Sequence, residues 1–446
     1  QRYKSGSIRY LIDQQAEASF ILRRCGSNCT LEYDFSQDIR QDIDDIKEKL
    51  KNKDLLPCIR YQLIQDANVL TQYVKEKYIK EKESQSFRFE HEGRSYIVYY
   101  DAPFSFIESD GKFLYISDSK GRGSSKEAFL LADIEGHPSS LVWLSFYEKT
   151  RDIRDSILRD RMFIQELFQA GLGFLISQVK FPETKDQLVQ VEKSKERFFT
   201  IMDNGGESLF RLIRSQSLPL DCFLDIGTQL VDLAKCFKNA GVLCRDIKSE
   251  NLVWSPESGL KQIDSEFWSK DSDSSGSVGT PEFLSPEEIT YYMNRRKIVI
   301  NECCYAVISR VGTAYSLISE TGIPYKLEVK GDTCQLIDPQ TRQCQVLDQK
   351  PILLRSEGDV SSQTIEDLLR QDLWKYGLVL LEILLSRTLN GHDLKNVHLG
   401  DLDRLFDEIR QTFSLAVTES RKGQLEGLLE QCKGFLQREP HNRGFI

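Results

Sequence analysis

The chain has 446 residues, of which 40% are hydrophobic and 28% charged, and its net charge is −9. This length suits two or three domains with a real core, and the acidic balance without a basic tract excludes nucleic acid as the main partner. Eleven scattered cysteines, with Cys303 and Cys304 adjacent, form no disulfide framework. They indicate a reducing, cytoplasmic compartment. No apolar run approaches about 18 residues, so we expect no membrane span and no signal peptide.

Residues 1–85 are predicted to form a largely helical extension. One helical stripe comprises Ile39, Ile43, Ile46 and Leu50, after a possible cap at residues 36–38; a second comprises Ile59, Leu63, Ala67, Leu70 and Val74. Two interpretations stay open for this extension. It packs onto the next domain, or it binds a regulatory partner.

Residues 86–204 are predicted to form a small β-rich domain. A hairpin is expected over residues 87–100, where Glu92 and Gly93 supply the turn. Further strands are expected at residues 113–116, 128–131 and 141–144, followed by a helix over 151–170.

Residues 205–446 are predicted to be mainly helical, with an interruption at about 295–365. That interval contains short alternating runs at residues 298–300, 305–308, 315–318 and 325–329, which are typical of strands. We interpret it as an inserted β-rich element. The insert is either a docking or regulatory surface for a partner, or an extended loop whose only role is to pack against its own domain.

The sequence Cys-Arg-Asp-Ile-Lys-Ser-Glu-Asn at residues 244–251, followed by Asp264, carries the clearest chemistry. Phosphoryl transfer needs positioning and charge neutralisation, which carboxylates, an amide oxygen and a lysine supply. The run resembles the H-R-D-x-K-x-x-N catalytic loop of protein kinases, with Cys244 in place of His. Asp264-Ser265-Glu266 resembles the D-F-G motif that follows it.

Further motifs extend this resemblance over roughly residues 110–446, in the order of the family. Residues 279–287 resemble the loop that ends in A-P-E, residues 372–377 the start of the central helix, and residues 439–443 the segment whose Arg pairs with the A-P-E Glu. The resemblance implies an α+β, bilobal protein-kinase-like fold. It also implies a buried ion pair between Glu287 and Arg443.

The resemblance assigns roles to individual residues of this sequence. Asp246 would orient the acceptor hydroxyl and Lys248 would stabilise the transferred phosphoryl group, while Asn251 and Asp264 would hold Mg²⁺. Residues 200–207 resemble the strand and hinge that hold the adenine of ATP. Met202 and Asp203 lie in that segment.

The small domain departs from the family pattern at Leu144, which stands where the strand lysine of V-A-I-K belongs. However, Gly121-Arg122-Gly123-Ser124-Ser125-Lys126 is similar to the glycine-rich loop of the With-No-Lysine kinases, in which a loop lysine reaches the phosphates. Lys126 would take that role here, with Gly121 and Gly123 beside the nucleotide. Glu166 is the candidate carboxylate to pair with Lys126.

The predicted function is therefore an ATP- and Mg²⁺-dependent protein kinase. By the same resemblance, the combination of Lys248 with Thr280 implies Ser and Thr hydroxyls of a protein substrate as acceptors. Leu144 and Glu266 leave open a pseudokinase that acts as a nucleotide-binding or scaffold module, and a kinase fold redirected to another transfer reaction is the third alternative.

Regulation by phosphorylation is a further interpretation of the sequence. A phosphate could pair with Arg245 if it were added to one of the serines between Asp264 and Gly279, namely Ser272, Ser274, Ser275 or Ser277. The alternative is a flexible acidic loop.

Overall fold

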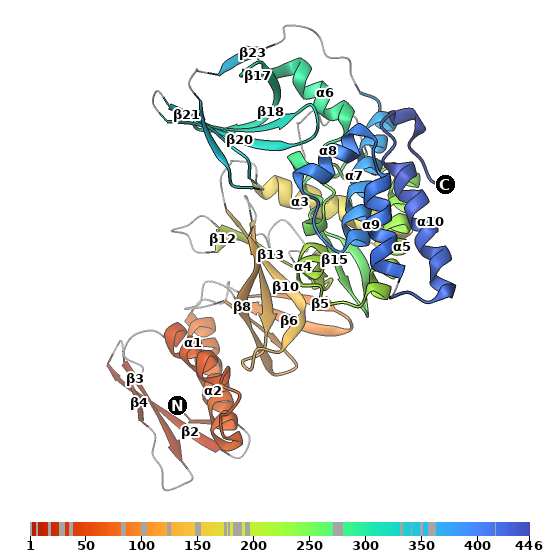
Figure 1. Ribbon diagram of the computed structural model, residues 1–446. Coiled ribbons are helices and arrows are strands. Elements are labelled where there is room, and N and C mark those ends of the chain that lie inside the picture. Colours follow the sequence, from red (N-terminus) through yellow and green to blue (C-terminus); the bar gives the residue numbers. More distant parts are fainter. Residues whose placement is uncertain are drawn as a thin grey trace. The chain divides into compact units, whose positions relative to one another are not determined.

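The computed structural model describes residues 2–5, 8–16, 19–25, 32–34, 39–81, 86–99, 105–122, 126–147, 153–173, 176, 179–181, 190–191, 197–270, 280–330, 333–339, 341–347, 351–355, 363–414 and 416–446. The chain is α+β and divides into two compact units. The N-terminal unit comprises Gln1–Gln165 and Ser177–Asn204, and the C-terminal unit comprises Glu166–Ile176 and Gly205–Ile446. Figure 1 shows the elements of both units.

The first part of the N-terminal extension is a sheet, so the prediction of a helical extension is wrong there. Four antiparallel strands follow one another in the order β1-β2-β3-β4: β1 (Arg2–Ser5), β2 (Ile8–Ala16), β3 (Ser19–Cys25) and β4 (Glu32–Asp34). The physical reason lies in the sequence. Its short runs are rich in β-branched and aromatic residues, and they carry no apolar stripe of helical period before Ile39.

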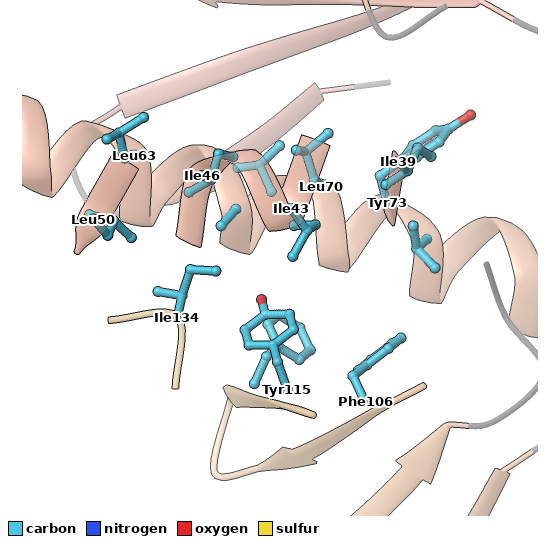
Figure 2. Close-up of a cluster of buried hydrophobic side chains, with 14 of the residues drawn as sticks. Ile39, Ile43, Ile46, Leu50, Leu63, Leu70, Tyr73, Phe106, Tyr115 and Ile134 are labelled. Atoms are coloured by element: carbon cyan, nitrogen blue, oxygen red, sulfur yellow. The ribbon is translucent and has the colours of Figure 1, made fainter. Parts of the chain in front are cut away.

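The two predicted helices of the extension are present as α1 (Ile39–Leu50) and α2 (Pro57–Glu81). The α1 stripe is buried along its whole length, and the α2 stripe is buried from Leu63 onward, whereas Ile59 is 44% exposed. Both stripes pack against aromatic and aliphatic residues of the following sheet (Figure 2). The proposed cap at residues 36–38 lies outside the described residues.

A larger antiparallel sheet completes the N-terminal unit, in the order β11-β13-β10-β9-β8-β7-β6-β5, with β12 paired to β13. Its strands are β5 (Ser86–His91), β6 (Arg94–Tyr99), β7 (Phe106–Ser109), β8 (Lys112–Arg122), β9 (Lys126–Ala132), β10 (Pro138–Tyr147), β11 (Val179–Phe181), β12 (Gln190–Val191) and β13 (Arg197–Asp203). The predicted hairpin is confirmed. Glu92 and Gly93 both have positive φ, which a two-residue hairpin turn requires.

One face of this sheet forms a closed apolar core. Trp143 stacks on Phe199 with ring centroids 4.0 Å apart, and Leu131, Leu141 and Ile201 are fully buried beside them. The helix predicted after the sheet is α3 (Ile153–Leu167), and its Ile157 packs with Phe198 of β13.

The C-terminal unit is mainly helical around one buried helix, α7 (Ile365–Leu385). The remaining long helices are α4 (Leu209–Ser215), α5 (Leu220–Asn239), α6 (Pro286–Arg295), α8 (Gly391–Leu399), α9 (Asp403–Ser414) and α10 (Glu419–Phe435). Thr364 caps α7 through a capping box with Asp367. The helix thus begins seven residues before Asp372, where the sequence motif had indicated its start, because the T-x-x-D cap precedes the motif.

The predicted strands of the insert form a seven-stranded antiparallel sheet, in the order β22-β21-β20-β19-β18-β17-β23. They are β17 (Arg296–Ile300), β18 (Cys303–Val311), β19 (Ala314–Ser319), β20 (Pro324–Lys330), β21 (Thr333–Ile337), β22 (Cys344–Leu347) and β23 (Ile352–Arg355). Ala306 and Ile318 pack against Leu284, Ile289 and Tyr292 at the start of α6. The insert therefore supports the segment that resembles A-P-E, while a partner for it stays a prediction.

The short sheet β14 (Glu207–Ser208), β15 (Leu252–Ser255) and β16 (Gly259–Gln262) lies in the C-terminal unit as well. Across the part of the chain that the structure describes, no helix has both the length and the apolar composition needed to cross a membrane. The domain boundaries predicted from the sequence remain predictions.

The packing of α1 can be tested by truncating one buried side chain. We expect Ile43→Ala to lower the free energy of unfolding of the N-terminal unit by about 2–5 kcal/mol, because it leaves a cavity in a close-packed core. Ile59→Ala, at the exposed position of the second stripe, should change it by less than about 1 kcal/mol. Urea unfolding with hydrogen exchange of α1 and α2 measures both; equal effects would contradict the packing.

Candidate active site

The loop that resembles the kinase catalytic loop is built in the C-terminal unit, directly after α5. Leu243 and Ser269 exchange two backbone hydrogen bonds, of 2.8 and 3.0 Å, which join the start of this loop to the segment after Asp264. A 3₁₀ turn at Ser249–Asn251 ends the loop and leads into β15. The two motifs, which lie far apart on either side of a hairpin in the sequence, are thereby held together.

Asp246 is the centre of the candidate active site. One carboxylate oxygen, Oδ2, accepts the Lys248 ammonium at 2.8 Å and the Asn251 amide nitrogen at 3.1 Å. The other, Oδ1, accepts the backbone N–H of Thr280 at 3.1 Å and its hydroxyl at 2.9 Å. Lys248 also donates to the Thr280 hydroxyl at 2.9 Å. The structure therefore brings the predicted residues Asp246, Lys248 and Asn251 together with Thr280.

Asp246 is an anion at neutral pH. Burial alone would raise the pKa of this carboxyl, but the Lys248 charge and the hydrogen bonds from Lys248 and Thr280 outweigh burial and hold the pKa below its usual value. A carboxylate with a low pKa is a weak base. It is suited to accept a hydrogen bond from a substrate hydroxyl and to orient it.

Asn251 and Asp264 lie at the same end of the β15–β16 hairpin. The N–H of Ile263, the residue before Asp264, donates to the Asn251 carbonyl at 2.9 Å. The Asn251 side-chain nitrogen donates to Asp246, both to its carbonyl at 2.9 Å and to its carboxylate. Because the nitrogen is used in this way, the amide oxygen points elsewhere. An amide oxygen and a carboxylate form the hard-oxygen donor set that Mg²⁺ prefers, so these residues fit the ion.

A buried carboxylate holds the backbone of the candidate catalytic loop in a strained conformation. Arg245 has φ 64° at the centre of a three-residue turn, in which the Asp246 N–H donates to the Cys244 carbonyl at 2.7 Å. The Asp372 carboxylate accepts the N–H groups of Cys244 at 2.7 Å and of Arg245 at 3.0 Å. Burial raises the pKa of Asp372 to about 6.

Lys375 links this loop to α6. Its ammonium donates to the Arg245 carbonyl at 2.6 Å and to Glu288 at 2.9 Å, and its side chain is 2% exposed. Glu288 in turn closes a capping box with Ser285 at the start of α6. Ser285 stands at the Ala of A-P-E, and the capping box explains the exchange.

The sequence motifs did not assign roles to Asp372, Lys375 or Glu288. The S-x-x-E spacing of Ser285 and Glu288 is a capping-box signal that could have identified one of them. Nothing in the sequence could have identified the contacts of Asp372, because its partners lie 127 and 128 residues away.

The predicted ion pair between Glu287 and Arg443 is confirmed. Arg443 Nη2 donates to Glu287 Oε2 at 2.8 Å, and Nη1 contacts the second carboxylate oxygen. The Arg443 side chain is fully buried, and its guanidinium lies over the Trp374 ring, 4.9 Å from the centroid. A planar, bidentate cation on an aromatic face is a geometry that only arginine supplies.

Cys244, which replaces the family histidine, is buried. Tyr376 donates its hydroxyl proton to the Gln262 side chain at 2.9 Å, and the Cys244 sulfur lies 3.8 Å from the same hydroxyl oxygen. Burial raises the pKa of the Cys244 thiol well above its usual value, so the thiol stays protonated. The residue packs and takes no part in proton transfer.

Three carboxylates lie near this centre. Burial, with smaller contributions from the charges of Glu250 and Glu282, raises the pKa of Glu382 to about 7, although the Leu389 N–H donates to Glu382 at 3.2 Å. Burial also raises the pKa of Glu282, which Glu250 raises further and Lys248 lowers. Burial and the nearby carboxylates therefore disfavour the charged forms of Glu382 and Glu282.

The strand register decides how Lys126 relates to Leu144 in the N-terminal unit. In the β9–β10 pair, Lys126 lies opposite Phe146 and Ala128 opposite Leu144, so all four side chains are on one face of the sheet. The Lys126 ammonium lies 5.9 Å from the centroid of the Phe146 ring. Lys126 is thus the diagonal neighbour of the position where the family lysine would stand.

The predicted adenine-binding residues lie at the end of β13, next to β10. Met202 pairs with Val142, which places it on the same face as Leu144 and Lys126. Asp203 pairs with Leu141 and projects to the other face. Gly121 lies in β8 opposite Ala128.

The remaining predicted residues either have another partner or lie outside the described part of the chain. Glu166 forms an ion pair of 2.8 Å with Lys270, so its pairing with Lys126 stays a prediction. Gly123, the Glu266 side chain and residues 271–279 with their serines lie outside the described part of the chain. Their predicted roles, phosphorylation included, are therefore unchanged.

Comparison with known proteins gives two distant protein kinases as relatives. A calcium/calmodulin-dependent protein kinase type 1 of Macrobrachium nipponense is 24% identical over 181 residues, covering 39% of this chain and 48% of that protein. A protein kinase C-like 1 of Saccharomyces cerevisiae is 24% identical over 139 residues, covering 30% of this chain and 12% of that protein. No protein-family model matches the chain. The chain is therefore distantly similar to protein kinases over part of its length, and spans about half or less of these relatives.

The raised pKa of Glu382 predicts a pH dependence of stability. Between its usual pKa and about 7 the folded state binds more protons at this site than the unfolded state, so the wild type loses stability as pH rises through that window. Gln does not titrate, so Glu382→Gln does not lose stability in this way. Its free energy of unfolding relative to that of the wild type should rise by up to about 3 kcal/mol between pH 4.5 and pH 8. Urea unfolding at both pH values tests this, with Glu257→Gln as an exposed control; parallel curves would refute it.

Proposed function

We propose that the chain is an ATP- and Mg²⁺-dependent protein kinase that transfers the γ-phosphoryl group to Ser and Thr hydroxyls. The observation that carries this proposal is the convergence of Lys248, Asn251 and Thr280 on the Asp246 carboxylate. A scaffold has no chemical need for a buried carboxylate, a lysine and an amide in this arrangement. The distant similarity to two protein kinases agrees with it.

The acceptor hydroxyl needs one position on Asp246. The carboxylate accepts four hydrogen bonds, which is about its full capacity. Lys248 is the partner that can leave, since it is the mobile point charge among the four. An incoming phosphate would attract Lys248 away from Oδ2, and the acceptor hydroxyl would then donate to that oxygen. Lys248 would at the same time neutralise the transferred group.

Mg²⁺, when bound, would neutralise the phosphate charge. Asn251 and Asp264 would hold the ion with side-chain oxygens, because the hairpin register brings both residues to one end of β15 and β16. Lys126 would contact the phosphates from β9 in place of a lysine at Leu144. The shared face of these two positions supports this exchange, because a long flexible side chain can serve from a neighbouring strand.

Thr280 supports Ser and Thr as acceptors. Its hydroxyl already donates to Asp246 and accepts from Lys248, so the site accommodates an aliphatic hydroxyl at this distance. A pseudokinase is the second candidate. It is favoured by Leu144, an apolar residue at the position of the family lysine, and by Glu266 after Asp264.

Substitution of the two key side chains tests the transfer reaction. We expect Asp246→Asn to lower kcat at least 100-fold, because the hydroxyl loses its anionic acceptor, and Lys126→Met to raise KM for ATP or lower kcat about tenfold or more. Lys112→Met, at an exposed lysine of β8, should match the wild type. Transfer of labelled phosphate from ATP with Mg²⁺ to generic protein substrates measures these effects.

The outcomes separate the two candidates. If the wild type binds ATP but transfers nothing, the pseudokinase is correct. If Lys126→Met equals Lys112→Met while Asp246→Asn is inactive, the kinase stands and the role of Lys126 fails.

The acidic residues near Asp246 bear on the substrate. Glu250 is exposed, Glu282 is partly exposed and Glu382 is buried, so the three carboxylates extend from the protein surface inward. Glu382 is buried and is stabilised by hydrogen bonds from the Leu389 N–H and the Ser249 side chain, so a substrate would meet Glu250 and Glu282 instead. A carboxylate at or near the surface attracts a cation. We therefore propose a substrate segment with a basic side chain near its acceptor hydroxyl.

A peptide series tests this preference. We expect a Ser peptide with one Arg at its best position to have kcat/KM about tenfold or more above the same peptide with Gln, because charge-assisted hydrogen bonds contribute about 1.5–3 kcal/mol. Glu250→Gln should reduce that ratio severalfold, whereas Glu257→Gln, on the exposed β15–β16 turn, should not. No difference between Arg and Gln at any scanned position would contradict the preference.

A further inference from the structure

Strand β8 consists of two parts, which its partner strand β9 holds with different regularity. Between Ile116 and Arg122 it advances six residues, whereas its partner β9 advances only four, from Leu131 to Glu127, and two register shifts absorb the difference. Unpaired residues at such bulges weaken the ladder and let the strand bend. The second part of β8, which contains Gly121, is therefore less firmly held by β9 than the first part.

The first part of β8 is held from outside the sheet by α2. Tyr115 and Thr71 share a buried hydrogen bond of 2.7 Å between their hydroxyls. Thr71 uses its single proton on the Ala67 carbonyl at 2.9 Å, so Tyr115 is the donor. Burial raises the pKa of Tyr115, and the phenol keeps the proton that it donates.

Further contacts fix the same part of the sheet. Lys47 of α1 donates to the Ile116 carbonyl at 3.4 Å, directly before the first register shift, and its ammonium lies 5.1 Å from the centroid of the Tyr115 ring. Lys75 of α2 pairs with Glu108 of β7 at 2.7 Å. Figure 2 shows Tyr115 and Phe106 between the sheet and the two helices.

The face that α1 and α2 cover is also the face of Lys126. Tyr115 pairs with Ala132 of β9, and Ala132 and Lys126 are separated by an even number of residues along one strand. Their side chains therefore project to the same side of the sheet. Lys47 of α1 contacts β8 at Ile116, six residues before β8 ends at Arg122.

We propose that the α1–α2 pair positions Gly121 and Lys126 by clamping the first part of β8, with Thr71, Tyr115 and Lys47 as the positioning residues. The assignment of Lys126 to ATP rests on the proposed function; the clamp itself does not. A ligand or modification that loosens α2 from Tyr115 would move the end of β8 and change nucleotide affinity. The N-terminal helices are thus a control point for the proposed nucleotide site.

The experiment removes one hydroxyl at a time from the full chain. Thr71→Val and Tyr115→Phe each delete the 2.7 Å hydrogen bond while keeping the shape of the side chain. We expect amide hydrogen exchange in peptides 116–122 and 126–132 to be about fivefold faster, which corresponds to about 1 kcal/mol per neutral hydrogen bond. KM for ATP should rise about threefold to fivefold, with kcat within twofold. The double variant should exchange no faster than Thr71→Val, because Thr71→Val alone leaves the buried Tyr115 hydroxyl without its acceptor.

Two controls separate positioning from a general loss of stability. Thr71→Ser keeps the hydroxyl and should restore both exchange and KM. Gln72→Met removes the neighbouring Gln72–Glu76 hydrogen bond, which lies within α2, and should leave both peptides unchanged. The proposal is overturned if Thr71→Val and Tyr115→Phe exchange in the two peptides at the same rate as Gln72→Met. It is also overturned if exchange in β5 and β10 rises by the same factor as in the two peptides. A wild type without ATP binding would refute the proposed function alone, because the exchange data still decide whether the clamp exists.

Discussion

The candidate site depends on one buried carboxylate. Asp372 accepts the backbone N–H groups of Cys244 and Arg245, and this holds Arg245 at a positive φ that a bulky residue rarely adopts. The turn places Asp246 where Lys248, Asn251 and Thr280 reach it. If Asp372 were replaced by an apolar residue, two buried donors would lose their acceptor and the turn would lose what stabilises it.

Helix α7 also carries the lysine that balances the buried charge of Asp372. Lys375, one turn after Asp372, balances Asp372 and Glu288 and donates to the Arg245 carbonyl. Trp374 lies beneath the Arg443 guanidinium, which pairs with Glu287. Helix α7 therefore contacts the candidate catalytic loop, the start of α6 and the C-terminal segment that contains Arg443. Because Lys375 and Arg443 are buried, loss of their carboxylate partners would leave a buried cation without its counter-charge.

In the N-terminal unit, the strand register determines which side chains share a face of the sheet. Lys126 and Leu144 share a face because residues 126 and 146 are paired, and a shift of one residue would turn Lys126 to the opposite face. The α1–α2 pair covers part of that same face through Thr71 and Tyr115. The buried stripes of α1 and α2 pack against this sheet, which agrees with the packing interpretation of the two helices.

The sequence by itself determined many of the local elements. The helices that carry the two apolar stripes, the hairpin at Glu92 and Gly93 and the strands of the insert follow from periodicity and turn residues, whereas the Glu287–Arg443 pair follows from the resemblance to protein kinases. The prediction of helix is wrong for β1 to β4, because these short segments carry no apolar stripe of helical period. Only the tertiary structure decided the support of Arg245 by Asp372, the partner of Glu166 and the hydrogen bond between Thr71 and Tyr115. Those contacts join residues that are 44 to 128 positions apart, and local pattern carries no information about such pairs.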